Sequence, residues 1–207
     1  MELKQAIEQR RSINFFDTEK KIDTDTINKI LELASLAPSS MNLQPWKVLT
    51  VVSDEKKELL KSAAFNQPKV TEASAVFVLL GDLDYMEKNI DATLGSMVEL
   101  GYMDKDAAEV MAGKALGAHG APDSEKRYKN AILNTSIFGM NLMYACLAYG
   151  VETHPMGGFD PKELKAKFGL SNRLIPVMLI AAGYLSPEKT LKPRVKRLLP
   201  KDFNHIL

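Results

Sequence analysis

One stretch of this 207-residue sequence restricts the possible folds more than any other: residues 131 to 151 contain no charged side chain. Such a run of 21 residues is long enough to cross a lipid bilayer as a helix. However, polar residues interrupt it, no basic cluster flanks one side, and no second run of this kind occurs. A soluble helix that is apolar all round is normally buried on all sides. We therefore expect a buried central helix from about Asp123 to Tyr149, ended by Gly150 in the left-handed conformation.

Composition and charge exclude several classes of protein. A content of 45% hydrophobic and 26% charged residues is ordinary for a globular chain. The net charge of +1 comes without a basic stripe, which argues against nucleic-acid binding. Cys146 is the single cysteine and the three histidines are scattered, so neither a disulfide nor a metal site is expected. The first ten residues are charged and lack the apolar core of a secretory signal, which favours a cytoplasmic protein.

Local patterns predict further helices and three strands. Asp23 or Thr24 can cap a helix that Pro38 stops, and Ser53 is a typical cap for another. Residues 75–80 contain no charge, so this strand is expected to be central in its sheet. The chain has no internal repeat or low-complexity linker, so residues 1–207 are interpreted as one domain. Further expected elements are a helix to about residue 11, strands at 46–52 and 177–182, and a helix from Pro161 to Gly169.

Two regions are predicted to lie outside this core. Residues 82–122 form an expected helical insertion, in which 82–109 hold eight acidic and two basic residues and the glycines Gly95 and Gly101 break the helix. The glycine-rich segment 113–120 lacks both Rossmann spacing and a P-loop hydroxyl, and we interpret it as a flexible lid. The basic tail 186–207 contains three prolines and is expected to be extended.

Three polar clusters are candidates for binding. Residues 10–16, Arg-Arg-Ser-Ile-Asn-Phe-Phe, begin with two guanidinium groups, which match phosphate oxygens in two-point geometry. Residues 37–46 hold two hydroxyls, two amides and two prolines, which suit the edge of an uncharged planar heterocycle. In residues 153–160, Gly157 and Gly158 leave two backbone amides unobstructed. The alternatives remain open: a favourable helix C-terminus for the first cluster and simple turns for the other two.

These clusters resemble the FMN-dependent nitroreductase family over nearly the whole chain. The resemblance is carried by residues 10–16, 37–46, 65–69, 155–160 and 191–194, and it is weakest between residues 82 and 123. It implies an α+β fold, with a central mostly antiparallel sheet wrapped by helices and the long helix at the core of a homodimer. In this family both active sites lie at the interface between the two subunits.

The resemblance also implies a set of contacts to FMN. Arg10, Arg11 and Ser12 would contact the phosphate and ribityl chain, together with two basic residues of the tail. The loop 38–42 would reach the FMN of the other subunit, residues 66 and 69 the pyrimidine edge, and the backbone after Pro155 the N5 and O4 atoms. The expected cofactor-binding residues are Arg10, Arg11, Ser12, Asn14, Pro38, Ser39, Ser40, Asn42, Asn66, Lys69, Pro155, Met156, Gly157, Gly158, Lys192 and Arg194.

Two positions depart from the family pattern. Asn14 stands where the family usually has a basic residue, so a cation expected near N1 and O2 of the flavin is absent and Lys69 is the remaining candidate. Gly157 stands where some members have a glutamate that shapes the nicotinamide pocket. The preference for NADH or NADPH therefore stays open.

The implied activity is an NAD(P)H-dependent reduction of nitro compounds or quinones in a ping-pong cycle of two electrons. Hydride would pass through N5 of FMN, so no catalytic side chain and no metal is required. Two alternatives remain: a reductase of the same fold for activated alkenes or free flavin, and a flavin-binding or storage protein without turnover. The physiological electron acceptor cannot be deduced from the sequence.

Overall fold

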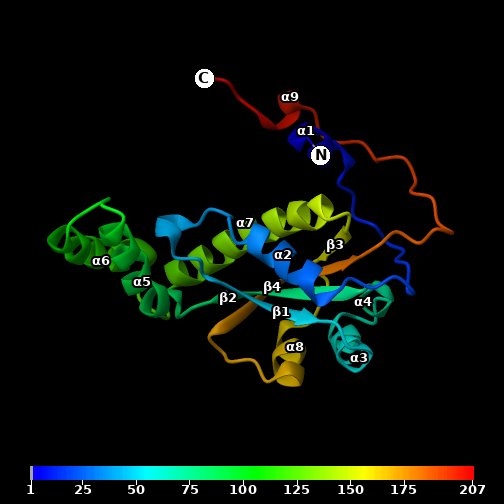
Figure 1. Ribbon diagram of the computed structural model, residues 1–207, viewed down its shortest axis with the longest axis horizontal. Coiled ribbons are helices and arrows are strands. Elements are labelled where there is room, and N and C mark those ends of the chain that lie inside the picture. Colours follow the sequence, from blue (N-terminus) through cyan, green and yellow to red (C-terminus); the bar gives the residue numbers. More distant parts are fainter. Residues whose placement is uncertain (1) are drawn as a thin grey trace.

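The computed structural model describes residues 2–207 and has a four-stranded antiparallel sheet at its centre, with helices on both faces (Figure 1). The strand order is β1-β2-β4-β3. Every pairing is antiparallel, and β2 is buried along its whole length, as expected for a central strand without charge. The strands are β1 (Trp46–Val51), β2 (Ala75–Asp82), β3 (Glu152–Met156) and β4 (Leu174–Gly183).

The helices begin where the capping residues predicted. Side chains of Asp23, Ser53 and Asp160 each accept a backbone N–H bond at the start of a helix, which confirms these caps. The helices are α1 (Leu3–Gln9), α2 (Thr24–Ala34), α3 (Asp54–Ala63), α4 (Lys69–Glu72), α5 (Tyr85–Glu99), α6 (Lys105–His119), α7 (Glu125–Ala148), α8 (Pro161–Phe168) and α9 (Pro200–Phe203), with a 3-10 turn η1 (Ser40–Asn42).

The sheet separates two hydrophobic cores, because successive side chains of a strand point to opposite faces. On β2, Phe77 and Leu79 pack with α2 and α7, whereas Val76 and Val78 pack with residues of α3 and α8. Trp46 belongs to the first core, where its ring stacks on Phe138 with centroids 4.9 Å apart. The aromatic end of the polar segment 37–46 is therefore structural.

Helix α7 crosses one face of the sheet and is the predicted central helix. It ends at Ala148, and Gly150 beyond it has a φ of +71°, as predicted for its stop. Among residues 2–207 it is the one helix long and apolar enough to cross a membrane, and more than half of its apolar 18-residue stretch is buried inside the protein. The expectation of burial on all sides is wrong for the single chain, since Leu133 is 58% exposed and Ile137 38%.

The expected insertion is a helical hairpin, α5–α6, which projects beyond one end of the sheet (Figure 1). Helix α5 runs through Gly95 without a break, and Gly101, with a φ of +76°, follows its C-terminus. The interpretation of residues 113–120 as a flexible lid is wrong, because α6 continues to His119. Helix formers surround the exposed Gly113 and Gly117, and the hairpin is fixed to α7 by buried Arg127, which bonds Glu87 on α5 at 2.9 Å.

The C-terminal tail returns to the N-terminus. Residues 189–199 have no regular secondary structure, as expected of a chain interrupted by prolines, and α9 adds one short helical turn that was not predicted. Figure 1 shows α9 beside α1, so parts of the two ends of the chain lie together near the C-terminal end of α7.

Candidate functional site

Basic residues from both ends of the chain meet beside α1. The Arg11 side chain donates to the Lys192 carbonyl at 2.8 Å. Arg194 donates to the carbonyls of Glu8 and Arg10. The structure therefore brings together four residues that were expected to bind phosphate. Arg10 and Arg11 follow α1, whereas Lys192 and Arg194 belong to the tail, more than 180 positions away in sequence. One nitrogen of Arg194 is used to hold the tail against α1.

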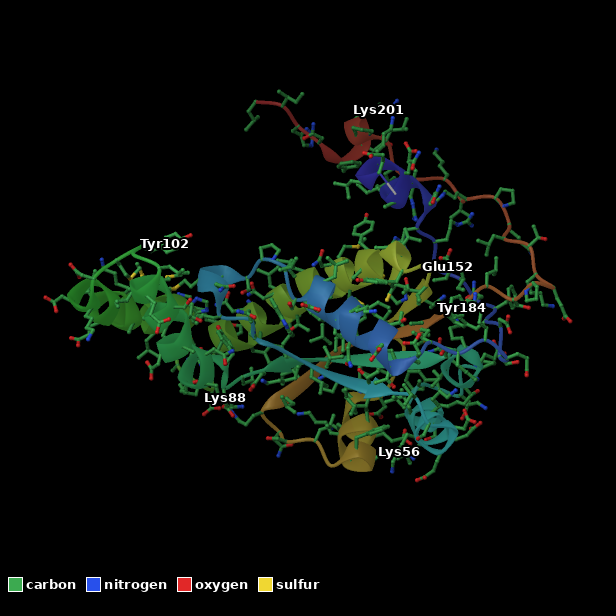
Figure 2. All side chains as sticks on the ribbon, in the orientation of Figure 1. Lys56, Lys88, Tyr102, Glu152, Tyr184 and Lys201 are labelled. Carbon is green, nitrogen blue, oxygen red and sulfur yellow. The ribbon has the colours of Figure 1, made fainter. Side chains whose placement is uncertain are left out.

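Arg10 differs from its neighbours because part of its guanidinium group lacks a partner. Its Nη1 atom is buried and makes no hydrogen bond with any residue between 2 and 207. A buried donor without a partner is costly, and an anion such as phosphate would satisfy this one. Burial raises the pKa of Glu152, the first residue of β3 (Figure 2), and the positive charge of Arg10 offsets part of this rise. The residues present thus fit an anionic group here.

Ser12 connects this region to the strand β3. It forms an isolated parallel bridge with Thr153, and the next backbone N–H, that of Ile13, donates to the Thr153 carbonyl at 3.1 Å. β3 was not predicted: residues 153–160 were interpreted as a candidate binding cluster or a simple turn. The reason is Pro155, which is excluded from central strands but tolerated here because β3 is an edge strand, paired along its length with β4 and contacted on its other side by the bridge at Ser12. Thr153 and Met156 are buried with two partly buried residues between them, so β3 lacks the regular alternation by which a half-buried strand is recognised.

After β3 in the chain, the expected glycine pair, Gly157 and Gly158, lies next to the segment 65–69. A side chain at Gly157 would meet no atom within 4 Å, so its backbone is open on that side. The Gly158 carbonyl accepts a bond from the Gln67 side chain at 2.8 Å, which fixes the turn to this segment. Phe65 and Asn66 both have left-handed backbone angles, with φ of 53° and 56°. The turn and the segment that carries Asn66 and Lys69 therefore lie together, as the resemblance implied.

Lys69 lies at the start of α4 and its ammonium group is 3.4 Å from Nε2 of His154 on β3. The other ring nitrogen of His154 is 2.7 Å from the Ile13 carbonyl. The His154 ring thus links Lys69 to the backbone of Ile13, the residue that precedes Asn14. Asn14 itself is exposed. His154 was not among the expected site residues, since nothing in the sequence spacing connects positions 13, 69 and 154.

The remaining expected residues lie elsewhere. Figure 1 shows η1 at the opposite end of α7 from α1 and β3, so the structure does not bring Pro38, Ser39, Ser40 or Asn42 to the first group within one chain. The loop is held by specific bonds: the Ser40 N–H donates to Asn134 on α7 at 2.9 Å, and Ser39 accepts from the Gln44 N–H at 3.0 Å. The loop is also strained, with φ of 53° at both Met41 and Asn42.

A buried polar network supports this loop from the insertion. His119 on α6 lies 3.2 Å from the Ser40 hydroxyl and 2.6 Å from the hydroxyl of Tyr85 on α5. Burial raises the pKa of Tyr85 to about 12. Burial also lowers the pKa of His119, with smaller contributions from Arg127 and Lys126. Both groups are therefore neutral near pH 7. Their contacts join three separate elements, so no local sequence pattern predicted them.

Next to this loop the insertion leaves a hollow of about 340 Å³. Tyr102, at the connection between α5 and α6 (Figure 2), is among the residues that border it. The hollow is mainly apolar and is lined by Asn42, Thr93, Ser96, Met97, Leu100 and Tyr102.

Comparison with known proteins decides how these features are to be read. The nitroreductase family model matches residues 7–184, which is most of the chain. The chain belongs to the nitroreductase family. The nitroreductase match runs from the last turn of α1 to the end of β4, and residues 1–6 and 185–207 lie outside it.

Similar nitroreductases support the same conclusion. "Putative NAD(P)H nitroreductase YodC" of Bacillus subtilis is 34% identical over 188 residues, covering 91% of this chain and 89% of the relative. A "putative nitroreductase in complex with FMN" from Exiguobacterium sibiricum is 30% identical, with a TM-score of 0.87 and coverage of 99% of this chain and 97% of that one. The "CLA biosynthesis enone reductase" of Lactiplantibacillus plantarum is 29% identical over 199 residues, 94% of this chain and 90% of the relative. The predicted α+β nitroreductase fold is thus confirmed.

Proposed function

We propose that this nitroreductase-family oxidoreductase binds FMN between two copies of the chain and uses NAD(P)H to reduce nitro compounds or quinones. The observation that carries the proposal is the buried Nη1 atom of Arg10, which lacks a partner and lies among basic residues at the place expected for a phosphate. When bound, FMN would supply two-electron hydride transfer at N5 in a ping-pong cycle. The protein would supply binding, orientation and charge.

Each group of residues has a separate task in this proposal. Arg10, Ser12 and the tail residues Lys192 and Arg194 would hold the phosphate and ribityl end, with Arg11 linking the tail to this group. Backbone N–H groups of Gly157 and Gly158 would orient the ring edge, since no side chain covers the backbone at Gly157. No side chain is needed as a general acid, because solvent can protonate a reduced nitro group.

The proposed homodimer follows from the division of the site. The loop 38–42 lies at the far end of α7 from the arginine cluster (Figure 1), so it would serve the FMN of the second copy. Helix α7 also exposes the apolar side chains of Leu133 and Ile137, which are four positions apart and therefore share one face of the helix. A second copy that covers this face would bring the two halves of each site together.

The absorption spectrum of the purified protein tests the proposal. We expect the flavin bands of bound FMN, bleaching by NADH or NADPH without oxygen, and return of the bands when a nitroaromatic compound or quinone is added. A protein that neither retains nor takes up FMN would contradict the proposal. Bound FMN that NADH and NADPH fail to bleach would instead indicate a flavin-binding or storage protein.

A second candidate is a reductase for activated alkenes, favoured by the similarity to an enone reductase. The mainly apolar hollow beside Asn42 is compatible with either class of acceptor. Steady-state kinetics with a nitroaromatic compound, a quinone and an α,β-unsaturated ketone would separate the two, because the preferred class should have the highest kcat/KM.

A further inference from the structure

We propose that His154 is a positioning residue that holds the ammonium group of Lys69 at the pyrimidine edge of the flavin site. This inference rests on the proposed function and adds a residue to it. Three elements meet at this point: β3 supplies His154, α4 supplies Lys69, and the segment after α1 supplies the Ile13 carbonyl. The contacts join positions that are 85 and 141 residues apart.

The partners of the imidazole ring determine its protonation state. A carbonyl oxygen can only accept, so Nδ1 of His154, 2.7 Å from the Ile13 oxygen, must carry a hydrogen. An ammonium group can only donate, so Nε2, 3.4 Å from Lys69, must present its lone pair. Neutral His154 with the hydrogen on Nδ1 is therefore the one state that satisfies both contacts. Protonation of Nε2 would replace the bond to Lys69 by repulsion between two cations.

The surroundings favour this neutral state. Burial lowers the pKa of His154, the nearby Lys69 lowers it further, and the Ile13 carbonyl opposes them in part. On its own strand the nearest charged residue is Glu152, which interacts with Arg10 and whose pKa is raised by burial. His154 thus remains an acceptor for Lys69 near pH 7.

The fixed position of Lys69 matters because position 14 is uncharged. Asn14 directly follows Ile13, and the family usually has a basic residue there, so Lys69 is the cation that this chain brings to the same backbone segment. A lysine has a flexible four-carbon stem, and using one of its donors on His154 restricts where the charge lies. A fixed cation stabilises the negative charge of reduced FMN more than a mobile one does.

Midpoint potentials of bound FMN test the inference. His154→Phe keeps a planar ring but removes both hydrogen bonds, whereas His154→Gln retains one donor and one acceptor. We expect His154→Phe to bind reduced FMN about tenfold less selectively over oxidised FMN, which corresponds to a midpoint potential about 30 mV lower. The potential of His154→Gln should stay close to that of the wild type. His205→Phe, in the exposed tail, is the control for the change itself. An unchanged potential in His154→Phe, or an equal fall in both variants, would overturn the inference.

A double-mutant cycle tests whether His154 acts through Lys69. Lys69→Met should lower the potential at least as far as His154→Phe, and combining the two should add nothing. Additive shifts would show that His154 acts independently of Lys69 and would refute the positioning role. Lys162→Met, an exposed lysine on α8, is the matched control.

A measurement without flavin separates this inference from the proposed function. NMR titration of His154 in the apoprotein should give a higher pKa in Lys69→Met than in wild type, because a nearby positive charge is removed. An unchanged pKa would mean that the pair is not formed. If the wild type takes up no FMN, the proposed function fails, while the titration still decides whether Lys69 and His154 interact.

Discussion

Arg10 connects the sequence motif to a ligand at the scale of a single residue, because one of its nitrogens is buried and has no partner in the described chain. We expect Arg10→Ala to weaken FMN binding by roughly ten- to hundredfold. This range corresponds to the loss of one charge-assisted hydrogen bond of about 1.5–3 kcal/mol. Fluorescence titration of the apoprotein with FMN gives the dissociation constants.

Arg197→Ala is the matched control for this change. Arg197 is exposed in the C-terminal tail, close in sequence to Lys192 and Arg194, and has no side-chain hydrogen bond in the described structure. It should bind FMN as the wild type does. A full FMN complement in Arg10→Ala after dilution below the wild-type dissociation constant would place the phosphate elsewhere.

The two half-buried or buried histidines predict a pH dependence of stability. Burial lowers the pKa of both His119 and His154, so the unfolded chain binds more protons than the folded one below about pH 6.5. The contribution of the two histidines to the free energy of unfolding is complete above their pKa in the unfolded chain. It is lost as the pH falls toward their pKa in the folded protein. Glu152, with a raised pKa, acts in the opposite direction at lower pH.

We therefore expect the free energy of unfolding to fall between pH 7 and pH 5, by at most about 1.4 kcal/mol per pH unit for each histidine. Urea unfolding at several pH values measures this slope. In His119→Gln the slope should be smaller than in wild type. A slope that is the same in both proteins would show that His119 does not titrate differently on folding.

Residues that carry chemistry by their identity were predictable, whereas their contacts were not. The arginines and glycines of the expected site form recognisable motifs, so their grouping could be expected from resemblance. By contrast, His119 and His154 acquire partners on other elements, 79 and 34 positions away for His119 and 85 away for His154. Such contacts depend on how helices and strands pack, and a single sequence does not contain that information.

Elements were predicted correctly where local chemistry decides the conformation. The uncharged strand β2 and the helix α8, with Asp160 before it and Gly169 in the left-handed conformation after it, follow from such signals. The prediction failed at β3, where tertiary pairing outweighs a proline, and at residues 113–120, where glycine was taken as a sign of a loop. At β3 packing overrides local propensity, whereas at residues 113–119 the helix formers around the exposed glycines outweigh their cost.

Two glycines of this segment should respond in opposite ways to alanine. Gly113 lies inside α6, is exposed, and has open space where a Cβ would stand, so Gly113→Ala should stabilise the protein by about 0.5–1 kcal/mol. Gly120 ends the helix with φ 80° and ψ 165°, a region almost restricted to glycine, and a Cβ there would collide with the Ser124 hydroxyl. Gly120→Ala should therefore destabilise it by about 1–3 kcal/mol.

Chemical denaturation of the two variants beside wild type checks this pair of signs. Because both positions belong to one segment, a general effect of losing glycine would change both stabilities in the same direction. That result would contradict the helical structure of residues 113–119, whereas opposite signs would support it.

At the scale of the whole molecule, the single chain has a divided binding site and an exposed apolar surface, and both involve α7. The expected binding residues are divided between the two ends of α7 (Figure 1), and α7 exposes the apolar side chains of Leu133 and Ile137. Exposed apolar surface on one helix face is typical of a protein interface. Together with the family assignment, this leads us to expect that dimerisation and FMN binding are coupled.

Charges placed on the open face of α7 test this coupling. Leu133→Glu combined with Ile137→Glu would place two carboxylates in the proposed interface, and burying them there without partners costs several kcal/mol, so we expect a monomer. Since each monomer holds only part of a site, its FMN occupancy should fall at least tenfold. Val52→Glu is the matched control, at an exposed apolar position directly after β1, and it should remain dimeric with FMN bound. Sedimentation velocity at 280 and 450 nm across a dilution series reports assembly and bound flavin in the same experiment. A monomeric double variant that retains its full FMN complement would refute the shared site, because one chain would then hold every contact that the flavin requires.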